Sequence, residues 1–130
     1  MENETKKKSL EEIRNYLVGT EKFKLDLEKV EIFLHHLTWE EVSKIDNIIK
    51  DREVPRNDIV IYSRELKILT LVYAIDKIIF KDDKSTIDTN DKIKLENFLR
   101  TLPNDLVDVL YFKYEEDANE LLKSIQKKIV

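Results

Sequence analysis

The sequence contains no cysteine, one glycine and two prolines. Without cysteine there is no disulfide framework, no thiolate metal site and no cysteine nucleophile. A single glycine leaves no glycine-rich phosphate-binding loop, and the chain has neither a P-loop nor a G-x-S-x-G motif. So few turn-forming residues also disfavour a sheet-rich sandwich. We therefore expect long helices joined by few tight turns, and no enzymatic activity or cofactor.

A basic surplus is also missing, because 23 basic residues face 27 acidic ones and the net charge is −4. Nucleic-acid binders usually carry excess positive charge, so that class is disfavoured. The run Lys6–Lys8 is interpreted as part of a solubilising tail. The longest uncharged run in the most apolar stretch, 68–75, is far shorter than the ~18 residues of a membrane-spanning helix. We expect no membrane partner and a cytoplasmic location.

Apolar and charged residues are both abundant, at 42% and 38% of 130 residues. This balance predicts one globular domain over 9–130, preceded by a flexible tail over 1–8. Apolar residues are densest over 58–80. The expected fold is mainly α, in the α+β class. It has four to five helices around a central apolar helix, and a small antiparallel β element near the N-terminus.

The stretch 22–36 contains two short runs in which apolar residues alternate, in opposite phase. A two-residue turn at Glu28–Lys29 would give every apolar residue an apolar partner. The predicted pairs are Phe23–Leu34, Leu25–Ile32 and Leu27–Val30. Glu-Lys is not the Asn-Gly type of turn that such hairpins prefer, and the same residues also fit a helical stripe. We prefer the hairpin, and the helix remains open.

Capping boxes mark two helix starts, S-x-x-E at Ser9 and T-x-x-E at Thr38. The first begins a helix over about 10–18 and the second an amphipathic helix over 39–50, whose apolar stripe includes Trp39 and Val42. Pro55 interrupts the pattern. The remaining elements are a short strand over Asp58–Tyr62, a central helix from 64 to about 80 capped by Ser63, a polar loop over Lys81–Asn90, a helix from Asn90 to about Leu102, and a last helix over about 104–128.

The last helix, within 104–130, is longer than a small domain requires, at roughly 37 Å for 1.5 Å per residue. Its far end is expected to extend past the core and to offer a surface to a partner protein or to a second copy of the chain. Aromatic residues often anchor interfaces, although core packing is the competing interpretation for the cluster at 111–114. The candidate partner-binding residues are Tyr111, Tyr114, Leu121, Leu122 and Ile125.

Other polar clusters fit no catalytic or metal site. His35 and His36 are adjacent, so they point to different sides and cannot share an ion. The acidic loop lacks the glycine and the alternating oxygens of a calcium loop. Paired carboxylates lie at helix starts or on wet faces, without the desolvation that acid–base catalysis needs. These acidic residues are Asp82, Asp83, Asp88 and Asp91 in the loop, and the pairs Glu40–Glu41, Asp105–Asp108 and Glu115–Asp117.

Three stretches in order carry a resemblance: LTWEEVSKI at 37–45, RELKILTLVYAIDKI at 64–78 and LRTLPNDLVDVLYFKYEE at 99–116. Over about 37–125 the chain resembles small tail and baseplate assembly chaperones of tailed bacteriophages. The resemblance implies a non-enzymatic protein that binds a tail or baseplate component in the host cytoplasm, as a chaperone or as a minor virion subunit. It identifies no site residue. The alternative is a small helical regulator that binds nucleic acid or a host protein.

Overall fold

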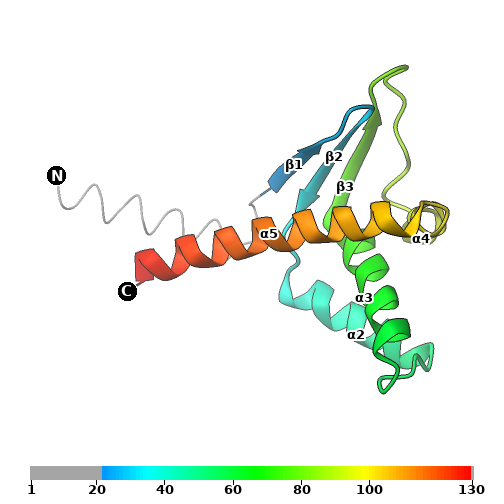
Figure 1. The fold of residues 1–130 in the computed structure, drawn as a ribbon, viewed down its shortest axis with the longest axis vertical. Coiled ribbons are helices and arrows are strands. Elements are labelled where there is room, and N and C mark those ends of the chain that lie inside the picture. Colours follow the sequence, from blue (N-terminus) through cyan, green and yellow to red (C-terminus); the bar gives the residue numbers. More distant parts are fainter. Residues whose placement is uncertain (1–21, 130) are drawn as a thin grey trace.

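The computed structural model describes residues 22–129, so the predicted tail over 1–8 and the helix over about 10–18 lie outside the described residues. The chain is mainly helical with a small antiparallel sheet, which confirms the predicted α+β class (Figure 1). The elements in order are β1 (Lys22–Asp26), β2 (Val30–His35), α2 (Trp39–Asp51), α3 (Ile59–Ala74), β3 (Ile75–Phe80), α4 (Lys92–Arg100) and α5 (Asn104–Ile129).

The predicted hairpin over 22–36 is confirmed, including its register. β1 and β2 run antiparallel, with Phe23 opposite Leu34 and Leu25 opposite Ile32. The Leu27 N–H donates to the Val30 carbonyl at 2.9 Å, which closes the turn. The turn residues 28 and 29 have no positive φ. The turn is therefore not of the primed type, and the Asn-Gly preference of primed turns does not apply.

The prediction for the start of the central helix is wrong. α3 begins at Ile59, and its N-cap is Asp58 rather than Ser63. The Asp58 side chain accepts the Ile61 N–H at 3.2 Å. A β-branched residue loses at most about 0.7 kcal/mol in a helix relative to alanine, whereas an Asp cap contributes roughly 1 kcal/mol. With Tyr62 and Leu66 packed against the α2 residues, the helix prevails over the predicted strand at Asp58–Tyr62.

The end of the predicted central helix is also wrong, because Ile75–Phe80 forms the third strand. β3 pairs antiparallel with the open edge of β2, and a bulge shifts the register between Phe33 and Leu34. Residues three apart in a regular strand point to opposite faces of the sheet, yet Ile75 and Ile78 are both in the core. The helical apolar period thus continues in the sequence, but backbone pairing with β2 decides the structure, because β2 would otherwise leave its second edge unpaired.

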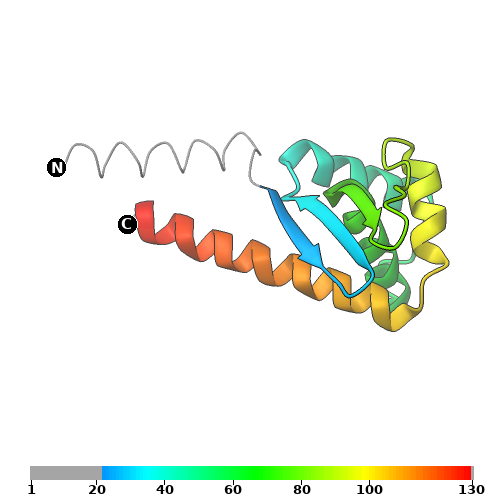
Figure 2. The same cartoon turned by 90° about the horizontal axis from the view of Figure 1, so that it is seen from above.

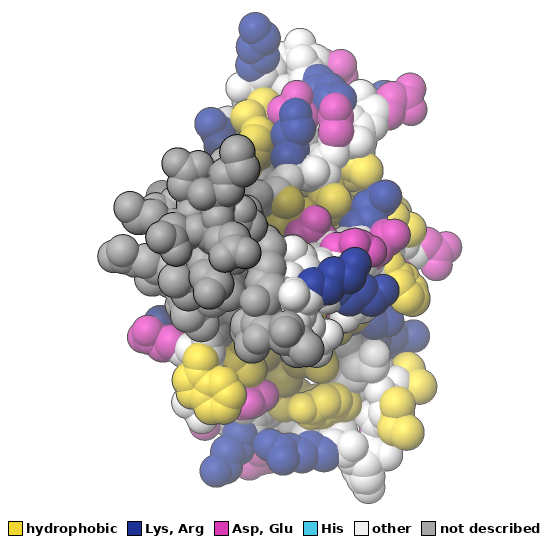
Figure 3. All heavy atoms as spheres, turned by 90° about the vertical axis from the view of Figure 1, so that its left-hand side faces the viewer, with side chains coloured by type: hydrophobic (Ala, Val, Ile, Leu, Met, Phe, Trp, Pro, Cys, Tyr) yellow, Lys and Arg dark blue, Asp and Glu magenta, His cyan; other side chains and the backbone are white. Residues whose placement is uncertain are grey.

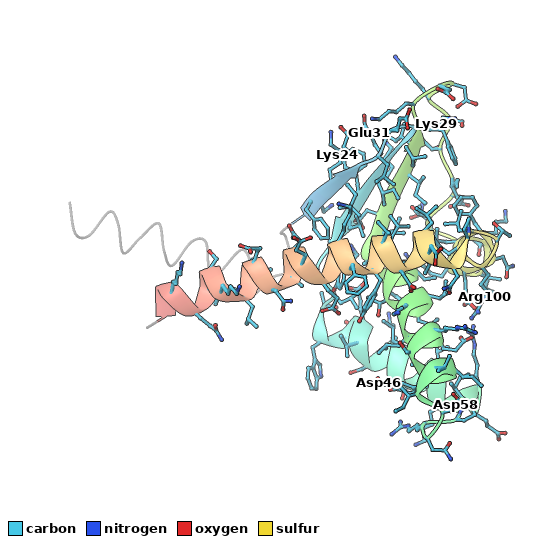
Figure 4. The ribbon with its side chains drawn as sticks, viewed as in Figure 1. Lys24, Lys29, Glu31, Asp46, Asp58 and Arg100 are labelled. Carbon is cyan, nitrogen blue, oxygen red and sulfur yellow. The ribbon has the colours of Figure 1, made fainter. Side chains whose placement is uncertain are left out.

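α3 remains the central helix, since it contacts α2, α4 and α5. One face of the sheet packs on α4 and on the first half of α5. Separately, α2 packs on α3 (Figures 1 and 2). The opposite face of the sheet carries polar residues, among them Lys24 and Glu31 (Figure 4). The buried core residues shared by sheet and helices include Ile32, Leu34, Leu71, Val72, Ile78, Leu95, Leu99 and Leu110.

Shorter features refine the predictions. The capping box of α2 is confirmed, with Thr38 and Glu41 bonded reciprocally. α4 is capped by Asp91, one residue after the predicted Asn90. The predicted polar loop over Lys81–Asn90 is not entirely unpaired, because the Phe80 N–H donates to the Ser85 carbonyl at 2.9 Å. Residues 85–87 thereby cover the outer edge of β3, which would otherwise be open to another strand.

Four charged side chains join the end of α2 to α3 and α4. Arg52 makes two bonds of 2.9 Å to the Glu96 carboxylate. Arg100, at the end of α4 (Figure 4), donates to Glu65 at 2.7 Å and to Glu96 at 3.0 Å. The hydrogen bonds from Arg52, against the opposing effect of burial, hold the pKa of Glu96 below its usual value. The folded state therefore favours the charged form of Glu96.

Glu96→Gln is expected to lower the free energy of unfolding at pH 7 by about 1 kcal/mol, because the two arginines keep their charge but lose a charged acceptor. The folded pKa of Glu96 is depressed, so its contribution is fully present above the unfolded value of about 4.3 and is lost as the pH falls through the folded pKa. Urea unfolding between pH 2 and 7 measures this. Glu116→Gln, an exposed site, is the control. A difference from wild type that stays constant down to pH 2 would contradict the linkage.

Candidate functional site

The candidate site is α5, whose two halves differ in their surroundings. The first half packs on the core, against the sheet and α3. The second half extends beyond the sheet and beyond α2, α3 and α4 in both views (Figures 1 and 2). The predicted extension past the core is therefore present. The five predicted partner-binding residues are divided between these two halves.

Tyr114 lies in the core half and is buried. Its hydroxyl accepts the Leu37 N–H at 3.2 Å, and its ring centroid is 6.2 Å from that of Phe23. Burial raises the pKa of Tyr114, so the phenol stays neutral. Tyr114 therefore holds α5 to the β2–α2 connection and is not exposed to a partner.

Tyr111 is half-buried, on the side of α5 that faces α3. The ammonium of Lys67 lies 5.9 Å from its ring centroid and also pairs with Asp108 at 3.0 Å. Burial raises the pKa of Tyr111 above its usual value, as does its neighbour Glu115. This cation–π contact joins α3 to α5, and the Lys67 ammonium occupies one face of the Tyr111 ring.

The other three predicted residues lie together on the outer half of α5. Leu122 is 53% exposed, while Leu121 and Ile125 are partly buried. Leu121 and Ile125 are one turn apart and share a side of the helix, and Leu122 lies beside them. The structure thus brings these three residues to one apolar strip, which lies further along α5 than the two tyrosines.

Several exposed apolar residues were not predicted as site residues. On α5 these are Phe112, 68% exposed, and Val109, which lies one turn earlier. Trp39 is 86% exposed at the start of α2, with Val42 beside it. The predicted amphipathic helix is present, but these two members of its apolar stripe are exposed. The residues at positions 45, 48 and 49 form an apolar stripe without Trp39 and Val42, and this was the signal in the sequence that those two residues need not be buried.

The tip of α3 adds a further apolar region, because Ile59, Val60 and Ile61 are all exposed. Asp58 precedes them at the lower end of the molecule, and Asp46 lies on the outer side of α2 (Figure 4). Hydrophobic side chains gather on the lower part of the face in Figure 3, over α2 and α3. Exposed apolar side chains are thus found on α5 and also at the starts of α2 and α3.

The two adjacent histidines point to different sides, as predicted. His35 joins β3 to the start of α2, with Nδ1 2.8 Å from Asp76 Oδ1 and Nε2 2.9 Å from Glu41 Oε1. His36 joins β2 to α5, with Nε2 2.6 Å from Asp117 Oδ2. Burial raises the pKa of Asp117, and His36 opposes this effect. Both imidazoles therefore make structural links between elements.

Three acidic residues of the 82–91 loop serve turns and caps. Asp83 accepts the Ser85 N–H at 2.9 Å, and Asp88 accepts the Asn90 N–H at 3.0 Å. Asp91 accepts two N–H groups at the start of α4. Within residues 22–129 no group of three or more acidic or histidine side chains is placed to hold a metal ion. The carboxylates nearest to a calcium pattern are thus used by the backbone.

The main hollows of the described surface differ in chemistry. A small cavity of about 90 Å³ beneath the hairpin is lined only by apolar side chains from the hairpin, β3, α4 and α5. A second hollow, of about 230 Å³, lies between α3, α4 and the start of α5 beside Arg64 and Lys67. A third, of about 260 Å³, lies where β1 begins and brings Lys22 and Phe23 close to Leu121. Only the third borders the apolar strip on α5.

No protein family model, curated protein or solved structure matches this chain. In the described part of the chain, no helix combines the length and apolar character needed to cross a membrane.

Proposed function

We propose that this chain is a non-enzymatic protein-binding component of phage tail or baseplate assembly, a chaperone or a minor structural subunit. The observation that carries the proposal is the outer half of α5, which presents Leu121, Leu122 and Ile125 beyond the rest of the described molecule. An apolar strip on a helix that extends from its domain suits a groove or a helix of another protein. The resemblance over 37–125 supplies the class of partner.

Other exposed side chains support a binding function. Trp39 and Phe112 are large aromatic residues at the surface, and aromatic residues are the most frequent anchors of protein interfaces. They lie on different elements, so they can enlarge one interface or serve a second. The two histidines, in contrast, join elements of the fold, and Asp83 closes a turn of its loop. What supports a non-enzymatic protein is this engagement of its polar groups in structural links.

Leu122→Glu is expected to reduce recovery of a tail or baseplate component at least about tenfold, since losing one apolar anchor costs upwards of 1.4 kcal/mol. The measurement is affinity purification of the tagged chain from phage-infected cells, with partners identified and quantified by mass spectrometry. Leu122 is already exposed, so the fold should be unaffected. This is checked by thermal unfolding.

Ile93→Glu is the matched control, because Ile93 is 74% exposed on α4, away from the outer half of α5. It should leave the recovery unchanged. Equal losses in the two variants would remove α5 as the site. A wild-type chain that recovers no tail or baseplate component from infected cells would overturn the proposed function itself.

A further inference from the structure

The cavity of about 90 Å³ beneath the hairpin is lined, within the described part of the chain, by apolar side chains alone. Its buried members, among them Leu99 and Leu110, form the floor. Its partly exposed members form the mouth, and these include Val30, Leu102 and Leu106. The cavity is therefore rooted in the core and is reached from solvent past an apolar rim.

Backbone hydrogen bonds hold the two walls of the cavity independently of each other. On the hairpin side, the Leu27 N–H donates to the Val30 carbonyl at 2.9 Å and closes the turn. On the helix side, the Leu102 N–H donates to the Leu99 carbonyl at 3.2 Å, where α4 ends and the chain turns into α5. Each wall is thus held by its own backbone. The space between the walls is preformed, as small-molecule sites usually are.

The lining determines which chemistry the cavity can accept. A water molecule in a cavity needs about three polar partners, and no residue of the described lining supplies one. A hydroxyl, an amide or a charge would lose its hydrogen bonds to water on entry without replacing them. A hydrocarbon group, in contrast, gains dispersion contacts with walls that otherwise face empty space.

The size and the rings of the lining narrow the ligand further. An engineered apolar cavity of ~150 Å³ in another protein binds benzene, so this smaller cavity accepts at most one six-membered ring. Phe80 and Phe98 both belong to its lining. Aromatic side chains favour edge-to-face or offset contacts with a second ring. A single unsubstituted aromatic ring thus matches the cavity in volume and in chemistry.

We propose that this cavity is a binding site for a small apolar molecule of about the size of a benzene ring. The ligand is held by contacts with hydrocarbon side chains and needs no hydrogen bond. The cavity involves the first half of α5 and lies at the α4 end of this helix, away from its outer half (Figure 1). The site does not rest on the proposed function, because Leu121, Leu122 and Ile125 take no part in it.

Benzene and neutral pyridine are matched probes of this site, because the rings are nearly equal in size and pyridine adds one hydrogen-bond acceptor. Benzene should bind the wild-type chain at least about tenfold more tightly, since the buried nitrogen would lose its hydrogen bond to water without gaining another. Titration followed by NMR of the methyl groups measures both dissociation constants. The shifts should be confined to the lining, including the methyl groups of Leu27, Val30, Leu102 and Leu106. Equal affinities, or no saturable shift with benzene, would overturn the proposal.

Leu106→Phe is expected to weaken benzene binding at least about tenfold, because the larger side chain occupies the space that the ligand needs. Val109→Phe is the control, since it adds a ring to the same helix at an exposed position and should leave the dissociation constant unchanged. Val30→Phe fills the cavity from the opposite wall, should the first ring turn outward. Thermal unfolding checks that each variant folds. Unchanged benzene affinity in both filling variants, with native unfolding, would overturn the site. If neither variant folds, the benzene–pyridine comparison in wild type still decides.

Discussion

Replacing Leu71 by alanine is expected to lower the free energy of unfolding by about 3–5 kcal/mol. The Leu71 side chain is fully buried, on the side of α3 that meets the sheet, α4 and α5. Its cluster combines side chains of the sheet, α4 and α5, which are separate elements and cannot move together to fill the space left by the missing atoms. The loss thus includes both the transfer free energy and the cost of a cavity.

Urea unfolding followed by circular dichroism at 222 nm measures the Leu71→Ala effect. Leu122→Ala removes the same atoms from an exposed position on α5 and should change the free energy by no more than about 0.5 kcal/mol. In both variants the free energy of unfolding should depend on urea concentration with the same slope as in wild type, since the area exposed on unfolding hardly changes. Similar losses from the two variants would contradict the central position of α3.

Ile78→Lys is expected to be still more damaging, by at least about 4 kcal/mol, which leaves much of the protein unfolded. Ile78 is 2% exposed, pairs with Ile32 and points into the core. A lysine there would place an ammonium group among apolar side chains. No carboxylate is paired with this position in the sheet, so the cost of desolvating the charge is not offset.

Ile79→Lys is the matched control, one residue later on the outer face of β3. Its partner in the register is Glu31, so the new lysine meets an opposite charge across the strands, and the change should stay within about 1 kcal/mol. In a helix over 64–80, positions 78 and 79 would both lie in the buried stripe. Equal damage from the two substitutions would therefore favour the helix over the strand, and thermal unfolding distinguishes the two.

The hairpin and α2 could be predicted from the sequence because their determinants are local. Two alternating runs in opposite phase specify the pairs Phe23–Leu34 and Leu25–Ile32 without reference to the rest of the chain. The Thr38–Glu41 box likewise fixes the start of α2 within four residues. Only the turn at positions 28 and 29 lacked a typical sequence.

The segment 58–80 was misassigned because its structure depends on distant partners. Its apolar residues keep a helical period past Ala74, but β2 offers an unpaired edge that Ile75–Phe80 completes. At its other end, four β-prone residues are held in a helix by the Asp58 cap and by packing on α2. Tertiary contacts outweigh propensities of a few tenths of a kcal/mol per residue.

The candidate site was predicted only in part. Helical spacing indicated that Leu121, Leu122 and Ile125 cluster beyond the core. It also grouped Tyr114 with them, because the same stripe runs through the buried half of α5. Which part of a stripe is covered depends on how far the sheet reaches along the helix, and Tyr114 lies where Phe23 and Leu37 still contact it. The exposure of Trp39 and Phe112 depends on the same long-range arrangement.

The middle strand β2 also determines the order in which the sheet can assemble. Its partner β1 lies just before it, across the two-residue turn, but its partner β3 begins on the order of 40 residues further along the chain, so closing that longer loop costs more chain entropy. Packing of α2 on α3 through Ile45, Ile49 and Leu69 shortens the loop between β2 and β3 before these two strands pair. Docking of β3 is then the late, high-contact-order step, so strengthening it should slow unfolding more than it speeds folding.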